Sequence, residues 1–507
     1  MSRRSGLFAL AFGSGFAVLA IEIAGARLIA PVFGLSAVPW TAVIGVILTA
    51  LALGNHFGGR LADAGKVPLS RILVVAGFTG LLPVLGAGVP WVARSVLGFI
   101  PGAVVSALVL FAPPVLCLGA VVPYLVRADT ESLETIGRRA GDISAAATTG
   151  SIAGSFVTGF FLLPAMPLPV LLGLTAGALF VMAWAASRIL GEGGFGGGVL
   201  MAALVGPAVG LLASGTPPDT LHAEQTLHTS VRVTERTWAD GSRVRELWQN
   251  GGSSSAEYVA SGAPAHVYAR ASLEIVRPFV AEMEQVLVLG GAALTLPVAL
   301  VAESDDLRVD VVEIDPEVTR LAEAYFTYGE APRPAIDVIH EDGRVFLRAP
   351  ARYLGRAAGD PETRASGAGA PQYDLIYLDV FDHLLTVPWT MVTREALADM
   401  AALLDEDGIF MANVLSPLEG EGRVFLQRLR ATLESVFGDV RVYLADPTLD
   451  AGATQNLVVL ATVDPSLLPP LDRPQTSVTG EGRPFTDAWA PVEYLQAKVF
   501  LEGLRWR

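Results

Sequence analysis

The chain has 507 residues, of which 52% are hydrophobic and 17% charged, so it is more apolar than an average soluble domain. The charge is unevenly divided: residues up to Ser214 carry 11 Lys and Arg against 7 Asp and Glu, and the remainder carries 24 against 43. This acidic second part argues against a nucleic-acid partner, because phosphate binding needs a basic surface, and it is compatible with cationic substrates.

The first part of the chain contains apolar segments of about 20 residues, the length that crosses a bilayer. The run that follows Arg3 and Arg4 is too long for a cleaved signal peptide, so we expect it to be retained as a membrane helix. Residues 1–215 are therefore predicted to form a multi-pass helical domain in the cell membrane, with the lipid bilayer as its partner. Seven spans are expected, at Leu7–Phe33, Trp40–Phe57, Ile72–Val92, Ala103–Val126, Ile143–Leu163, Pro169–Ala186 and Gly197–Leu212.

The basic residues of this domain fall in alternate loops, which predicts a cytoplasmic N-terminus by the positive-inside rule. Seven spans would then place the rest of the chain outside the cytoplasm, whereas six would place it inside. The sequence leaves this side open. The basic groups are Arg3 and Arg4, then Arg60, Lys66 and Arg71, then Arg127, Arg138 and Arg139, then Arg188, while the intervening loops carry Arg94 alone.

Several residues of the membrane domain could have particular roles. Glu22 and Arg27 lie in and at the end of the first span, where ionisable groups mark a functional site or a contact between helices. Gly150 and Gly154 lie one helical turn apart among small residues, which predicts close helix packing. The single cysteine, Cys117, lies in an apolar run and is expected to be a buried thiol. One cysteine excludes disulfides within the chain, and the six histidines lack metal-binding spacing, so we expect no metal.

Residues 216–262 are predicted to form a small β element ahead of a larger domain. The segments TSVRVTERT (229–237) and RVRELWQN (243–250) have the composition of short strands, with a turn at residues 239–242 between them and a Gly-Gly turn after them. A helix is expected next, around His266–Phe279.

Residues 263–507 alternate between strand and helix, which predicts an α/β Rossmann-like, methyltransferase-type domain with helices on both faces of its sheet. The Gly- and Ala-rich tract Arg356–Gln372 is expected to be a surface insertion. Strands are expected at Gln285–Leu289, Val309–Ile314, Ile336–Ile339, Asp374–Asp379, Gly408–Val414, Val440–Ala445 and Leu457–Thr462. Helices are expected near Leu294–Glu303, Pro316–Phe326, Arg344–Leu347, Arg394–Leu404 and Gly422–Phe437.

Ligands bind such sheets at the carboxyl ends of the strands. The first strand ends in Gly290-Gly291 before a helix, and Glu313 ends the second strand, 22 residues after Gly291. At that spacing a carboxylate reaches the ribose hydroxyls of a nucleotide.

Acidic residues also follow the next two strands: Asp342-Gly343 follows the third, and Asp379 and Asp382 follow the fourth. Acids at three successive strand ends favour an adenosyl-binding site over a purely structural sheet.

The motifs of this domain, in order, are VLVLGG, VVEIDP, EDG, YDLIYLDVFD and FTDAWAPVEYL. Together they resemble the spermidine synthases, or polyamine aminopropyltransferases. The membrane domain is similar to that of the family's membrane-fused bacterial branch, through Glu22…Arg27 with PVFG and through GDISAAATTGSIAGSFVTGFFLLP. The resemblance covers nearly the whole chain. It implies transfer of an aminopropyl group from decarboxylated S-adenosylmethionine, a co-substrate that is not permanently bound, to a diamine such as putrescine.

The resemblance also implies roles for individual residues. Asp379 matches the base that binds the amine and accepts its proton, which is needed because alkyl ammonium groups are protonated at pH 7. Asp382 matches a second acid that holds the diamine, and Tyr268 matches a substrate-side tyrosine. Asp487 is expected to be structural or near the pocket edge. The residues expected to bind the adenosyl group are Gly290, Gly291, Glu313 at the ribose, Asp342 at the adenine, and Gly343.

This chain departs from the family pattern at three motifs. The family loop GGGDGG is GGAALT here, so Ala293 stands where the family has an aspartate for the aminopropyl ammonium. QNGGSSS replaces LDG-x-x-Q, and VFDHLLTVPW lacks the Pro-Gly frame that follows Asp382 in the family. These changes concern recognition of the aminopropyl donor and of the diamine more than binding of the adenosyl group.

Three functions therefore remain open from the sequence. The first is a membrane-tethered aminopropyltransferase. The second is another S-adenosylmethionine-dependent transferase, for instance a methyltransferase. The third is a non-catalytic membrane protein that binds an adenosyl nucleotide or a polyamine. Homodimers are ordinary among relatives of this fold, so a homodimer is also expected.

Overall fold

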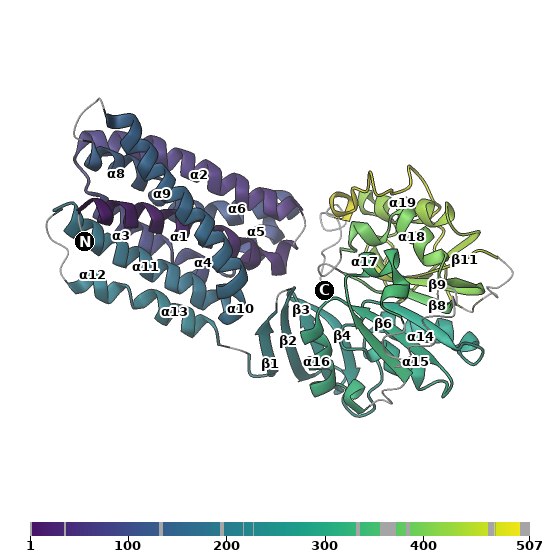
Figure 1. The fold of residues 1–507 in the computed structure, drawn as a ribbon. Coiled ribbons are helices and arrows are strands. Elements are labelled where there is room, and N and C mark those ends of the chain that lie inside the picture. Colours follow the sequence, from purple (N-terminus) through teal and green to yellow (C-terminus); the bar gives the residue numbers. More distant parts are fainter. Residues whose placement is uncertain are drawn as a thin grey trace. The chain divides into compact units, whose positions relative to one another are not determined.

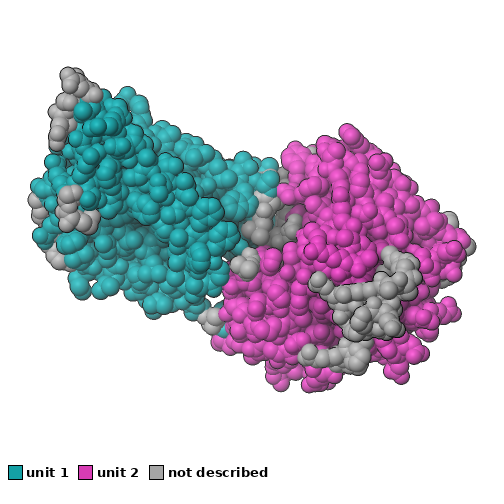
Figure 2. All heavy atoms as spheres, in the orientation of Figure 1, with its two compact units in different colours: residues 1–217 teal, residues 218–507 magenta. Residues whose placement is uncertain are grey.

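The computed structural model describes residues 3–34, 37–130, 135–192, 197–215, 217–226, 228–330, 335–354, 372–381, 386–464, 471 and 473–496. The chain divides into two compact units, residues 1–217 and residues 218–507, which Figure 2 colours separately. The first unit is helical, and the second contains two β-sheets with their covering helices (Figure 1).

The first unit is a bundle of apolar helices. Among its described residues, five helical segments are long and apolar enough to cross a membrane, and a sixth is obtained if Leu69–Leu85 and Val89–Leu97, which meet at 69°, are one broken span. Its helices are α1 (Arg3–Phe33), α2 (Ala37–Ala64), α3 (Leu69–Thr79), α4 (Leu82–Leu85), α5 (Val89–Leu97), α6 (Phe99–Leu110), α7 (Ala112–Gly119), α8 (Val121–Asp129), α9 (Ile136–Val157), the π-helical η2 (Thr158–Leu162), α10 (Leu163–Ala165), α11 (Leu168–Ile189), α12 (Gly197–Ala202) and α13 (Val205–Ala213).

The last segment expected as a span, Gly197–Leu212, differs from the other helices. It forms two short helices, α12 and α13, instead of one long one. Glycines on α11 and α13 let these helices pack closely: a Cβ on Gly206 would clash with the Gly173 carbonyl oxygen, and one on Gly210 with the Pro169 carbonyl oxygen. Residues late in α13 thus contact residues early in α11, so α13 runs antiparallel to α11.

Helices α1 and α9 pack together through small residues. A Cβ on Gly150 would clash with the Phe12 carbonyl oxygen, and one on Gly15 with the Ala147 carbonyl oxygen. A Cβ on Gly154 would lie 2.6 Å from the Phe16 carbonyl oxygen. The close packing predicted from the Gly150 and Gly154 pattern is therefore confirmed.

Ion pairs join the helix ends of this unit. Arg4 of α1 pairs with Asp142 of α9 at 2.8 Å, and Arg139 pairs with the buried Asp129 at 3.1 Å. Elsewhere on α1, Glu22 and Arg27 are both half-buried.

The second unit begins with an antiparallel sheet of four strands in the order β1-β2-β3-β4. These strands are β1 (Thr220–Gln225), β2 (Ser230–Thr237), β3 (Arg243–Gln249) and β4 (Gly252–Tyr258). The hairpin between β3 and β4 turns at Asn250 and Gly251, with φ of 48° and 84°. Left-handed φ at both central residues is typical of a type I′ turn and favours Asn-Gly. The turn is therefore one residue earlier than the Gly-Gly turn expected from the sequence.

The large sheet has seven strands in the order β10-β11-β9-β8-β5-β6-β7. Strand β11 is antiparallel to both of its neighbours, and the other neighbouring strands are parallel. The strands are β5 (Gln285–Leu289), β6 (Arg308–Glu313), β7 (Ile336–His340), β8 (Tyr373–Leu378), β9 (Leu404–Ser416), β10 (Asp439–Leu444) and β11 (Gln455–Thr462). This mixed sheet confirms the Rossmann-like, methyltransferase-type fold class.

Helices cover both faces of the large sheet (Figure 1). Leu287 and Leu289 of β5 pack with one set of helices, and Val286 and Val288 pack with the other. Both faces of β5 are thus buried, which is why its sequence is continuously apolar. The helices are α14 (Val267–Val280), α15 (Thr295–Val301) and α16 (Pro316–Tyr325) on one face, α17 (Gly343–Arg348), α18 (Arg394–Ala401) and α19 (Val424–Glu434) on the other, with the short helices η3 (Thr327–Glu330), η5 (Pro350–Arg352), η6 (Trp389–Met391) and η7 (Glu421–Arg423).

The contact between α1 and α9 can be tested by adding one methyl group. Gly150→Ala should lower the unfolding temperature of the detergent-solubilised protein, because the new Cβ would clash with the Phe12 carbonyl oxygen. Overpacking of this kind costs about 1–3 kcal/mol. Gly141→Ala is the control on the same helix, since its Cβ would meet nothing within 4 Å. Equal unfolding temperatures for the two variants would contradict this account of the interface.

Candidate functional site

The carboxyl ends of four neighbouring parallel strands, β8-β5-β6-β7, lie side by side at one end of the large sheet. This line of strand ends is called the sheet edge. Asp379 follows β8, Gly290 follows β5, Glu313 ends β6 and Asp342 lies beyond β7. The Asp379 amide donates to the Leu289 carbonyl oxygen at 2.9 Å, which fixes Asp379 beside the end of β5. The structure thus brings these four predicted site residues to one edge.

The loop after β5 has an unusual backbone. Gly290, Ala292 and Leu294 all have left-handed φ, of 94°, 44° and 59°. A Cβ on Gly290 would clash with the Asp379 carbonyl oxygen, so glycine is required there. Ala292 and Leu294 keep the left-handed conformation at a cost of about 1–2 kcal/mol each. Strained backbone of this kind clusters at ligand sites. Ala292 and Leu294 thus adopt a backbone conformation that favours glycine, although neither residue is a glycine.

Glu313 holds this loop in place. One of its carboxylate oxygens accepts hydrogen bonds from the amides of Gly291 at 3.1 Å and Ala292 at 3.0 Å, and the other accepts from Asp315 at 3.0 Å. Burial raises the pKa of Glu313, and these three bonds oppose that effect. A carboxylate offers about four acceptor positions, so three bonds leave one for a ligand. Glu313 thus has a structural role that the sequence did not indicate.

Ala293 lies inside the protein, between the loop and the small sheet. Its side chain is fully buried with Val231, Val233 and Leu247 of strands β2 and β3. Its amide donates to Ser255 Oγ at 3.2 Å. This position is therefore an apolar packing contact between the two sheets.

Asp342 caps helix α17. Its Oδ1 accepts from the amides of Arg344 at 2.8 Å and Val345 at 3.0 Å, a common arrangement at the first turn of a helix. The cap leaves Oδ2 unused. A Cβ on the next residue, Gly343, would lie 3.0 Å from Met391 Cε, so the glycine allows Met391 to approach the start of this helix.

Asp379 is an acid at this edge whose pKa is strongly shifted. Its half-buried carboxyl accepts from Asn413 Nδ2 at 2.9 Å and also interacts with the hydroxyls of Tyr268 and Tyr377. Burial raises the pKa of Asp379 to about 7, against the lowering effect of the hydrogen bonds from Asn413, Tyr268 and Tyr377. Near neutral pH this carboxyl therefore exists in both protonation states, as a general acid–base group requires.

The two tyrosines remain protonated. Burial and the Asp379 carboxyl raise the pKa of both Tyr268 and Tyr377 well above the ordinary value. The Tyr268 hydroxyl also lies 3.1 Å from the Ser254 carbonyl oxygen, so its one proton can serve either that oxygen or Asp379. The Tyr377 hydroxyl lies 3.3 Å from Ser272 Oγ. Tyr268, expected on the substrate side, thus contacts Asp379.

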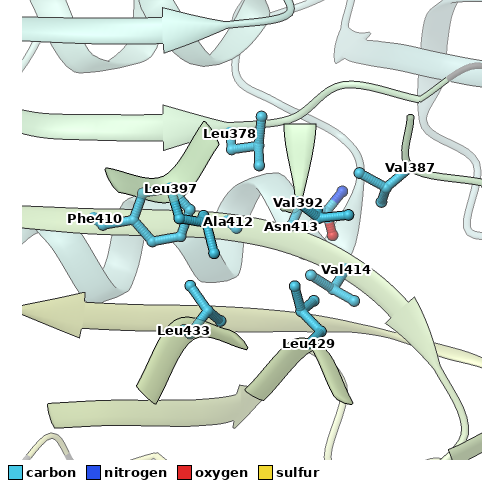
Figure 3. A pocket seen from close by; sticks show the side chains of 10 residues that line it. All are labelled: Leu378, Val387, Val392, Leu397, Phe410, Ala412, Asn413, Val414, Leu429 and Leu433. Carbon is cyan, nitrogen blue, oxygen red and sulfur yellow. The ribbon is translucent and has the colours of Figure 1, made fainter. Parts of the chain in front are cut away.

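Two residues beside Asp379, Tyr377 and Asn413, were not predicted. Tyr377, the second-last residue of β8, precedes Asp379 by two positions, so both side chains point to the same face of the sheet. Asn413 interrupts an apolar strand, and a buried polar residue in such a strand normally has a specific partner. Figure 3 shows Asn413 at the wall of a small cavity whose other nine lining residues are apolar.

The remaining predicted residues have other positions. Asp382 lies outside the described residues. Asp487 accepts from Arg344 at 2.9 Å, from Arg348 at 2.8 Å and from Thr393 Oγ1 at 2.7 Å. It therefore ties the C-terminal segment to α17 and to the start of α18, which is a structural role. Among the described residues, no group of three or more His, Cys, Asp or Glu is arranged to hold a metal ion.

No protein-family model matches the chain. A polyamine aminopropyltransferase from Vibrio vulnificus is 30% identical over 156 residues, which are 31% of this chain and 44% of that protein. An N-terminal histidine N-methyltransferase from Emericella nidulans is 30% identical over 178 residues, 35% of this chain and 27% of that protein. The crystal structure of a probable spermidine synthase from Corynebacterium glutamicum is 21% identical, with a TM-score of 0.39 over 49% of this chain and 81% of that one.

The chain spans less than half the length of these two curated relatives. The sequence similarity to a polyamine aminopropyltransferase agrees with the resemblance predicted from the motifs.

The burial of Asp379 predicts a pH-dependent stability. A carboxyl with a pKa of about 7 in the folded state and about 3.9 in the unfolded state takes up a proton on folding between these pH values. It therefore destabilises the fold progressively as pH rises from about 4 to 7, with the full cost present above pH 7. Asp379→Asn removes the charge, so it should raise the unfolding temperature relative to the unsubstituted protein more at pH 8 than at pH 5.

The control for this prediction is Asp306→Asn, which removes an exposed carboxyl away from the predicted site. Its effect on the unfolding temperature should be small at both pH values. If Asp379→Asn changes stability equally at pH 5 and pH 8, the Asp379 carboxyl does not titrate near neutrality.

Proposed function

We propose that the second unit is a polyamine aminopropyltransferase, which transfers an aminopropyl group from decarboxylated S-adenosylmethionine to a diamine such as putrescine. The observation that carries this proposal is the half-buried carboxyl of Asp379, with a pKa raised to about 7, at the same sheet edge as Glu313 and the left-handed loop. The similarity to the polyamine aminopropyltransferase of Vibrio vulnificus supports it.

In the proposed reaction the amine nitrogen attacks the carbon that links the aminopropyl group to the sulfonium sulfur. The new C–N bond forms as the C–S bond breaks, and the bonding pair moves to sulfur, which leaves methylthioadenosine. The nitrogen must shed a proton, and Asp379 accepts it. A carboxyl with a pKa of about 7 is a better proton acceptor than an ordinary one near 3.9, so the transfer from an amine is less unfavourable.

The adenosyl group would bind along the neighbouring strand ends. The remaining acceptor position of Glu313 would take a ribose hydroxyl, and Asp342 Oδ2, outside the helix cap, would accept from the adenine amino group. Because Gly290 has no side chain, the nucleoside could approach the backbone of the loop closely. The donor is a co-substrate that leaves as product.

A methyltransferase is the second candidate function. The observation that favours it is Ala293, whose side chain is buried among apolar residues and supplies no carboxylate for an aminopropyl ammonium. The similarity to the N-terminal histidine N-methyltransferase of Emericella nidulans also supports this candidate. Both reactions transfer an alkyl group from an adenosyl sulfonium, so the same sheet edge could serve either.

We also propose that the first unit tethers the enzyme to a membrane. Its described residues include five or six apolar helical segments of sufficient length. Large apolar side chains on the outside of α9 and η2, those of Phe156, Phe160 and Phe161, are more than half exposed, as lipid contact would require.

The proposed function predicts which product is released. The purified full-length protein, given decarboxylated S-adenosylmethionine and putrescine, should form methylthioadenosine, and Asp379→Asn should lower kcat/KM about 100- to 10,000-fold. Asp306→Asn should retain full activity. Methylthioadenosine formation at an undiminished rate after Asp379→Asn would exclude Asp379 as the base. Release of adenosylhomocysteine from S-adenosylmethionine would favour the methyltransferase, and nucleoside binding without either product would identify a binding protein.

Nucleoside binding can be measured separately from turnover. Glu313→Gln should weaken binding of methylthioadenosine about 10- to 100-fold by calorimetry, because hydrogen bonds to a charged group contribute about 1.5–3 kcal/mol. Part of this loss would come from the loop, whose amides of Gly291 and Ala292 lose their carboxylate acceptor. Glu282→Gln, an exposed substitution, is the control. Unchanged affinity after Glu313→Gln would place the nucleoside elsewhere.

A further inference from the structure

A chain of amide hydrogen bonds runs from Asp379 across the sheet. Asn413 Nδ2 on β9 donates to Asp379 Oδ1 at 2.9 Å, and Asn456 Nδ2 on β11 donates to Asn413 Oδ1 at 3.0 Å. The three residues thus link β8, β9 and β11, which are neighbours in the sheet. Asn413 is 3% exposed and Asn456 is half-buried.

The surroundings of Asn413 make its orientation important. The Asn413 side chain lies on the face of the sheet that also carries Tyr377 and Asp379, whereas the cavity in Figure 3 is lined by apolar residues of the opposite face, such as Leu378 and Val414. The two ends of an amide have nearly the same shape, so packing alone does not choose which end faces Asp379. The ionised Asp379 carboxylate can only accept, so it takes the Asn413 NH2 group, and the Asn456 NH2 group, which donates to the Asn413 oxygen, supports the same orientation.

We propose that Asn413 and Asn456 are positioning residues for the proposed transfer reaction, and that they make Asp379 Oδ2 the oxygen that receives the substrate proton. The unprotonated oxygen of a carboxyl group is the better acceptor, so the Asn413 bond favours Oδ1 as the oxygen that stays without a proton. The proton then resides on Oδ2, because the hydroxyls of Tyr268 and Tyr377, unlike an NH2 group, can also accept a hydrogen bond. This inference rests on the proposed role of Asp379 as base.

The same bond favours the ionised form of Asp379. Hydrogen bonding to a carboxylate lowers its pKa, and Asn413 opposes the effect of burial in this way. The other titratable groups at this carboxyl, among the described residues, are the hydroxyls of Tyr268 on α14 and Tyr377 on β8. Both stay neutral, so they do not titrate together with Asp379 near pH 7.

The test changes each link separately. Asn413→Leu removes the donor at similar volume, and Asn456→Asp replaces the second donor with an acceptor, which should turn the Asn413 amide so that its oxygen faces Asp379. Both variants should move the acidic limb of the kcat/KM profile for methylthioadenosine release upward by about one pH unit. At pH values well below 7 this shift corresponds to about a tenfold loss of kcat/KM, and at pH 9 it corresponds to little loss.

A double variant separates the amide chain from the charge of a new aspartate. If Asn456→Asp acts through Asn413, it should cause no further shift in the Asn413→Leu background, whereas a direct electrostatic effect would persist there. Gln427→Leu is the matched control, because it removes another buried amide, one that donates to Glu481. Unshifted profiles for Asn413→Leu, or a full further shift in the double variant, would overturn the proposal.

The proposal can also be tested if the protein forms no methylthioadenosine, which would refute the proposed function. The readout is then the pH dependence of the unfolding temperature, compared with and without Asp379→Asn in each background. The midpoint of that difference reports the titration of Asp379 and should rise in the Asn413→Leu and Asn456→Asp backgrounds. An unchanged midpoint would overturn the amide chain independently of catalysis.

Discussion

The burial of the Asp379 carboxyl at the end of β8 is the constraint on which the candidate site depends. Water does not fully solvate this group, so the protein must stabilise its charge with donors from several elements: Asn413 on β9, Tyr268 on α14 and Tyr377 on β8. These donors only partly offset burial, and the pKa stays near 7. The Asp379 carboxyl can therefore take up a proton near neutral pH. Its burial also lowers the stability of the fold above neutral pH.

A second carboxylate, Glu313, holds the neighbouring loop. By accepting the amides of Gly291 and Ala292, it keeps a left-handed loop shape that glycine would otherwise provide. Packing of Ala293 against the small sheet supports the same shape from the other side. The geometry needed for a nucleoside can therefore persist while the loop loses the aspartate found in the family motif. Binding of an adenosyl group therefore does not identify the donor, so the two must be tested in separate experiments.

Much of this arrangement could be predicted from the sequence, because apolar strands buried on both faces and acids at their carboxyl ends leave clear patterns. Every predicted strand of the large sheet is present, although β9 begins at Leu404, four residues early. Asn413 and Asn456 were missed because their pairing joins strands far apart in the chain. The left-handed Ala292 and Leu294 were missed because tertiary contacts, and not residue preference, impose that conformation. In the first unit, the span predicted at Ile72–Val92 is broken between Leu85 and Val89, where the two helices meet at 69°.

The central claim is that one sheet edge binds the nucleoside and places an amine at Asp379. A structure of the full-length protein with methylthioadenosine and putrescine tests it most directly. The account predicts ribose hydroxyls at hydrogen-bonding distance from Glu313, and an amine nitrogen about 3 Å from Asp379 Oδ2 while Oδ1 keeps its bond to Asn413. A nucleoside bound away from the ends of β5 and β6, or an amine that does not reach Asp379, would contradict it.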